Sequence, residues 1–174
     1  EELERVIEEV RKLVEEAEKK SREVIKTVKE LMDDVNRKSK KVLDDVRRLI
    51  EKVRREVTNE EELRKLTETI RKLIEDLKRM DEKSEDEIRR LVEELRRLNE
   101  KSKRDIERLI ELLKRGLDAD DALRRVKEIV ERNEEVVKEL LKRAEDIVRT
   151  NEKLVKDVLD TVRKLVKKVK DDED

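Results

Sequence analysis

Apolar residues recur every three or four positions along the first third of the chain. Between Leu3 and Val57 they stand at positions 3, 6, 7, 10, 13, 14 and 17, and six of the seven recur 18 residues later, with Ser21 in place of the first. At about 100° per residue, these positions form a single stripe roughly 120° wide on an α-helix. The pattern therefore predicts one continuous helix over about residues 2–57, with one buried face.

The same 18-residue unit continues through the rest of the chain. Leu66, Ile70 and Leu77 are followed by Ser84, Ile88 and Leu95 at the corresponding positions, and the units after residue 119 repeat in the same way. The polar positions hold mostly Glu, Lys and Arg, whose unbranched side chains favour helices. Two more helices are predicted, over about residues 59–115 and 119–171.

Two short segments carry turn signals. Thr58 or Asn59 can cap the second helix, and Gly116 stands where a helix C-terminal glycine is expected, just before Asp118 as a possible N-cap. An alternative reading breaks the second helix between Met80 and Glu87, because Ser84 and Glu87 also have capping-box spacing. The apolar phase continues unchanged across that segment, which favours an unbroken helix.

The repeat length predicts the fold. Eighteen residues in five turns is 3.6 residues per turn, so the helices need no supercoil to keep their stripes facing one another. Each has roughly 55 residues and should be about 80 Å long. We expect an all-α protein with one domain over residues 1–174, a nearly straight, antiparallel, up-down-up three-helix bundle.

Composition narrows the possible chemistry. The chain has 57% charged and 34% apolar residues and a net charge of −1, with no aromatic residue, proline, cysteine or histidine and a single glycine. Disulfides and thiolate chemistry are excluded, and a phosphate-cradling glycine loop cannot be built. No apolar run exceeds two residues, which argues against a membrane-spanning helix and a signal peptide. We expect a soluble protein with no natural location, cytoplasmic on recombinant expression.

Polar residues interrupt the apolar stripes at matching levels. Asn133 and Asn151, 18 residues apart, lie near the centre of the third stripe and should be buried. Folding the chain at its two turns predicts two polar layers, Ser21, Asn99, Ser102 and Asn133, then Ser39, Asp81, Ser84 and Asn151. A buried polar group without a partner costs about 1–3 kcal/mol, so these side chains should bond to one another.

The polar layers admit two interpretations, a binding pocket or a network that sets helix register. The second is favoured, because Ser and Asn offer no nucleophile–base pair and no aromatic wall is present to hold a ligand. Asp81 is the one carboxylate; we expect it at the solvent edge or neutralised by Lys38 or Lys40. We expect no catalytic residues and no cofactor site. Metal ligands are not expected either, since the pairs of adjacent acidic residues lack the spacing of a calcium-binding loop. Nucleic-acid and membrane partners are likewise not expected.

Uniform Glu/Lys/Arg surfaces, capped helix ends, an aliphatic core in 18-residue units and repeated Ser/Asn layers resemble de novo designed parametric helical bundles with buried hydrogen-bond networks. The resemblance covers the whole chain, and it lies in the general pattern of residues rather than in a specific sequence motif. It implies a structural scaffold rather than an enzyme, with no small-molecule partner. We expect a monomer, because two neighbours can cover a stripe of about 120°. The alternative is an interaction module that associates with a second copy or accepts a partner helix.

Overall fold

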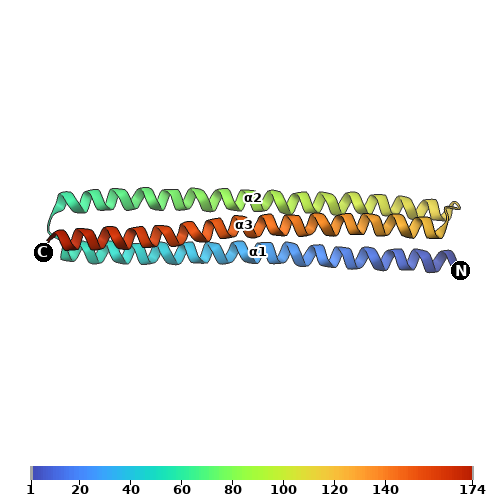
Figure 1. Ribbon diagram of the computed structural model, residues 1–174, viewed down its shortest axis with the longest axis horizontal. Helices are drawn as coiled ribbons and strands as arrows, with labels where there is room; N and C mark the ends of the chain where they lie inside the picture. The colour runs from blue at the N-terminus through green and yellow to red at the C-terminus, as the bar shows by residue number, and fades with distance from the viewer. Residues whose placement is uncertain (1, 174) are drawn as a thin grey trace. The chain divides into compact units, whose positions relative to one another are not determined.

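The computed structural model describes residues 2–173, and these form three long helices and no strand. Helix α1 spans Glu2–Glu56, α2 spans Glu60–Lys114 and α3 spans Ala119–Glu173 (Figure 1). The all-α three-helix prediction is confirmed, with helix ends within two residues of those expected. Helix α2 runs unbroken through residues 80–87, so the alternative reading of a loop there is wrong.

Asn59 ends the first connection and caps α2. Its side-chain Oδ1 accepts hydrogen bonds from the backbone N–H groups of Glu61 and Glu62 at 3.2 and 3.3 Å, and its carbonyl oxygen accepts one from the Leu63 N–H at 3.1 Å. Two of the N–H groups that a helix start leaves unpaired thus find an acceptor.

Gly116 ends α2 in the conformation that only glycine adopts easily. Its φ is +117°, and the N–H groups of Leu117 and Gly116 donate to the carbonyls of Leu112 and Leu113 at 2.9 and 3.1 Å. This pair of bonds is the Schellman arrangement, which satisfies two carbonyls of the last helical turn. A short connection can therefore reverse the chain between α2 and α3.

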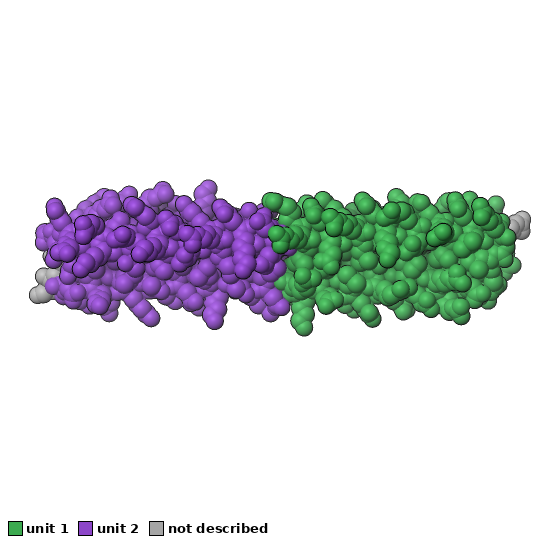
Figure 2. All heavy atoms as spheres, turned by 90° about the horizontal axis from the view of Figure 1, so that it is seen from above, with its two compact units in different colours: residues 1–29, 88–145 green, residues 30–87, 146–174 purple. Residues whose placement is uncertain are grey.

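The described residues fall into two compact units, coloured separately in Figure 2. Unit 1 comprises residues 2–29 and 88–145, and unit 2 comprises residues 30–87 and 146–173. Each unit takes one segment from every helix and has its own apolar core. Whether the chain behaves as the single domain expected from the sequence stays a prediction.

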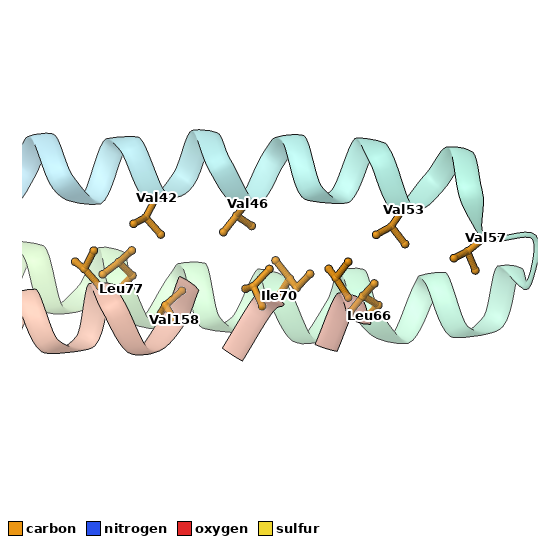
Figure 3. Close-up of a cluster of buried hydrophobic side chains, with 11 residues drawn as sticks. Val42, Val46, Val53, Val57, Leu66, Ile70, Leu77 and Val158 are labelled. Carbon is orange, nitrogen blue, oxygen red and sulfur yellow. The ribbon is translucent and has the colours of Figure 1, made fainter. Parts of the chain in front are cut away.

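The core of unit 2 is built from aliphatic side chains of all three segments. Figure 3 shows valines of α1 pointing toward residues of α2 and α3. The buried members of this core are Val42, Val46, Val53, Val57, Leu66, Ile70, Leu77, Val155, Val158, Val162 and Val166. In unit 1 the corresponding set is Val6, Val10, Ile106, Leu109, Leu113, Ala122 and Val126. All of these residues belong to the stripes predicted from the sequence.

Contacts within unit 2 define the directions of its helix segments. In unit 2, Lys38 pairs with Glu152 and Glu56 with Lys170, and the two residues of each pair are 114 positions apart. A constant separation means that the α1 and α3 segments run parallel. The residue numbers in Asn36–Glu85 and in Ser39–Asp81 add to nearly the same total, as they do between antiparallel helices. Unit 2 therefore has the predicted up-down-up order.

We predict that Gly116→Ala lowers the free energy of unfolding by about 1–2 kcal/mol, because an alanine at positive φ is strained. A Cβ at this position would meet no atom within 4 Å, so the cost lies in the backbone alone. Guanidinium unfolding followed by circular dichroism measures it. Arg115→Ala, one residue earlier and exposed, is the control and should change little; equal stability of the two variants would contradict this role of Gly116.

Candidate functional site

Asp81 joins all three helix segments of unit 2. Its Oδ1 accepts hydrogen bonds from Ser39 Oγ of α1 at 3.2 Å and from Asn151 Nδ2 of α3 at 3.0 Å. Ser39 is buried, Asn151 is fully buried and Asp81 is half-buried. One carboxylate oxygen thus links α2 to both of its neighbours at a single level.

The surroundings of Asp81 favour its protonated form. Burial is the main cause that raises the pKa of this carboxyl above 3.8; the nearby charge of Glu85 adds to the rise, and the hydrogen bonds from Ser39 and Asn151 oppose it. An ionised carboxylate loses hydration on burial, and two neutral donors replace only part of it. Asp81 is therefore the one polar-layer residue whose protonation state depends on its burial and its hydrogen bonds.

Lys38, one of the two cations considered as partners of Asp81, pairs with other carboxylates. Its Nζ is 3.1 Å from a carboxylate oxygen of both Glu152 and Asp34, and the hydrogen bonds to these two residues raise the pKa of the Lys38 ammonium. Asp81 is half-buried, which agrees with the alternative that places it at the solvent edge.

Asn151 has one hydrogen-bonding atom without a partner. Its side chain is 0% exposed, and among the described residues its Oδ1 is the one buried side-chain nitrogen or oxygen that forms no hydrogen bond. Ser84, the fourth residue predicted for this layer, is buried but is not joined to the other three by a hydrogen bond. The layer in unit 2 therefore has three connected members.

The layer in unit 1 consists of two pairs. Ser21 Oγ donates to Asn99 Oδ1 at 3.1 Å, which links α1 to α2, and Asn133 Nδ2 donates to Ser102 Oγ at 2.6 Å, which links α3 to α2. Ser21 and Ser102 are buried, whereas Asn99 and Asn133 are only half-buried. The predicted burial of Asn133 is therefore incomplete.

A cavity accounts for the exposure of Asn133. It measures about 490 Å³ in unit 1 and is lined by residues of all three helices, including all four members of the polar layer. The stripes alone predicted that Asn133 is buried. The signal that was overlooked is side-chain size, because α1 has Val14 and Ala17 here but Met32 and Val35 at the corresponding positions of unit 2.

Asn36 forms a half-buried polar contact between helices that was not predicted from the sequence. Asn36 Nδ2 of α1 donates to Glu85 Oε1 of α2 at 2.8 Å in unit 2. Asn36 lies at the edge of the apolar stripe, where a polar residue is ordinarily solvated. Thr27, Thr69 and Thr150 behave differently, because each donates to the carbonyl four residues earlier in the same helix.

The polar side chains offer structural hydrogen bonds. Their contacts are hydroxyl–amide, hydroxyl–carboxylate and amide–carboxylate bonds, and each joins two different helices. Within residues 2–173, no three carboxylates are placed to hold a metal ion, and none of the helices has a stretch long and apolar enough to cross a membrane.

Comparison of the chain with protein-family models, with curated proteins and with solved structures finds no match.

We predict that Asp81→Asn changes the pH dependence of stability. Because folding raises the pKa of Asp81, its favourable contribution is complete below about pH 3.8 and is lost as the pH rises through the higher pKa of the folded state. An amide has no such loss, so the variant should gain stability relative to the parent as the pH rises from 3 to 7.

Guanidinium unfolding of both proteins across this pH range measures that difference and cancels the titration of the other carboxylates. Asn99→Asp is the matched control, because it places a half-buried carboxylate at the corresponding position of unit 1 and should produce the opposite trend. A difference between Asp81→Asn and parent that does not vary with pH would refute the assignment.

Proposed function

We propose that the chain is a de novo designed structural scaffold without enzymatic activity, in which buried polar side chains specify the register of the helices. The composition supports this proposal: 57% of the residues are charged and none is aromatic, histidine, cysteine or proline. The same apolar positions recur through all three helices, and both turns use standard capping residues.

The observation that carries the proposal is that each polar layer links α2 to both neighbours. In unit 2 one oxygen of Asp81 bonds to α1 and α3, and in unit 1 the two Ser–Asn pairs do the same. Sliding one helix by a turn moves its side chains about 5.4 Å, which breaks bonds of this length. Aliphatic residues recur every three or four positions, close to one turn, and so distinguish poorly between such registers. The polar side chains supply the distinction.

An interaction module, the alternative use of such a bundle, requires an apolar face left for a partner helix. Among the described large apolar side chains, only Leu3 and Leu112 are clearly exposed, at 40% and 37%. They lie on different helices, and two isolated side chains do not form a docking face. This distribution favours the self-contained scaffold.

We predict that replacing the layer of unit 2 by apolar residues, in the triple variant Ser39→Ala, Asp81→Leu and Asn151→Leu, keeps the free energy of unfolding unchanged or raises it by about 1–2 kcal/mol. Every polar partner is removed together, so no group is left unpaired. The variant should populate more than one register, and the amide resonances of unit 2 in a ¹⁵N–¹H spectrum should split or broaden.

The control triple variant is Lys41→Ala, Glu82→Ala and Lys153→Ala, which changes exposed residues on the same three helices. It should give one set of sharp resonances. A single sharp set from both triple variants would mean that the polar layer does not specify register.

We also predict a monomer. Light scattering after size exclusion should give the mass of one chain, 21.0 kDa, from micromolar to millimolar concentration. A mass of two or three chains would favour the interaction module instead.

A further inference from the structure

The cavity in unit 1 has apolar walls from all three helices. Its volume of about 490 Å³ lies within the usual range of small-molecule sites, roughly 300–1,000 Å³. The apolar side chains that line it are Val14, Ala17, Val24, Ile106, Val130 and Val137. An organic group of the size of a benzene ring can lose its hydration against these walls.

Two side-chain groups at the cavity have hydrogen-bonding capacity to spare. Asn99 accepts through Oδ1 and Asn133 donates through Nδ2, which leaves the Nδ2 donor of Asn99 and the Oδ1 acceptor of Asn133 outside these bonds. Neither atom is among the buried atoms that lack a partner, so both remain open to the cavity or to solvent. The two asparagines thus offer an unused amide donor, Asn99 Nδ2, and an unused amide acceptor, Asn133 Oδ1.

Unit 2 offers an internal comparison, because it has related residues 18 positions further along the chain. The partly buried residues of the cavity include Val14, Ala17, Val24, Val130, Asn133 and Val137, and the residue 18 positions after each of these six is buried. Met32 replaces Val14 and Val35 replaces Ala17, and both are larger. The buried set in unit 2 is Met32, Val35, Val42, Val148, Asn151 and Val155. Unit 1, which has the cavity, therefore has smaller side chains than unit 2 at two corresponding positions of α1.

Charges around the cavity balance. The charged residues in its lining are three lysines and three glutamates, and one pair of them, Lys20 and Glu134, lies 3.2 Å apart. A net field of either sign would favour a ligand of the opposite charge. Here neither sign dominates, which favours an uncharged ligand.

We propose that this cavity binds a neutral small molecule that combines an apolar ring with a primary amide. The ring packs between the valines of α1 and α3. The carbonyl oxygen of the ligand accepts from Asn99 Nδ2, and its N–H donates to Asn133 Oδ1. The ligand thereby forms hydrogen bonds with the two unused amide groups of the polar layer. Binding forms and breaks no covalent bond.

Benzamide is the probe for a titration followed by ¹⁵N–¹H spectra of the full chain. We expect saturable shifts of the side-chain amide resonances of Asn99 and Asn133, with a dissociation constant on the order of millimolar, as suits a ligand of about nine non-hydrogen atoms. The side-chain amide of Asn151 in unit 2 should not move.

The variant Val14→Met with Ala17→Val transfers the two larger residues of unit 2 into unit 1. It should weaken benzamide binding at least tenfold by filling the cavity, while both hydrogen-bonded pairs of the layer remain. Its melting temperature should equal or exceed that of the parent, because cavity filling adds apolar contacts. The matched control, Leu3→Met with Leu112→Val, alters exposed apolar residues and should bind benzamide like the parent.

Two further probes test the chemical class. Benzene, which lacks the amide, and benzoate, which carries a charge, should each bind at least fivefold more weakly than benzamide. Equal binding of benzene or benzoate, or shifts that survive in the filled variant, would overturn the proposal. The absence of saturable shifts in the parent would also overturn the proposal. So would the finding that the chain forms a dimer that must dissociate before benzamide binds.

Discussion

A buried hydroxyl, amide or carboxylate must find a partner, and in both units this requirement acts between helices rather than within one. Leaving such a group unpaired costs about 1–3 kcal/mol, a large share of the stability of a typical domain. Ser21 and Ser39 meet the requirement through residues on α2, and Asn151 meets it there through Nδ2, while its Oδ1 forms no hydrogen bond. In the function we propose, aliphatic burial therefore holds the helices together and these few polar bonds determine their alignment.

The two layers solve the same problem with different chemistry. Asn99 in unit 1 and Asp81 in unit 2 both accept from a serine of α1. The carboxylate also accepts from Asn151, so it joins three helices through one oxygen, but burial raises its pKa. The amide avoids that electrostatic cost and leaves Asn133 to pair with Ser102. The layer built from hydroxyls and amides is thus looser, and the layer that contains the carboxyl group is better connected.

Much of this architecture could be predicted from the sequence because its information is periodic. A constant 3.6-residue period indicates the inward face, and the positions of the turns then place Ser21 beside Asn99 and Ser39 beside Asp81. Properties that depend on side-chain volume or rotamer could not be read in this way. The cavity beside Asn133 depends on the sizes of Val14 and Ala17. Lys38 pairs with Glu152 and Asp34 rather than with Asp81, which depends on the local positions of these side chains.

A double-mutant cycle between Asp81 and Asn151 tests most directly whether buried polar groups on different helices stabilise one another. The free energies of unfolding of Asp81→Ala, Asn151→Ala and the double variant are compared with that of the parent. The double variant should lose at least about 1 kcal/mol less than the two single losses combined, because each single change leaves its partner unpaired. Losses that add to within about 0.3–0.5 kcal/mol would contradict the account.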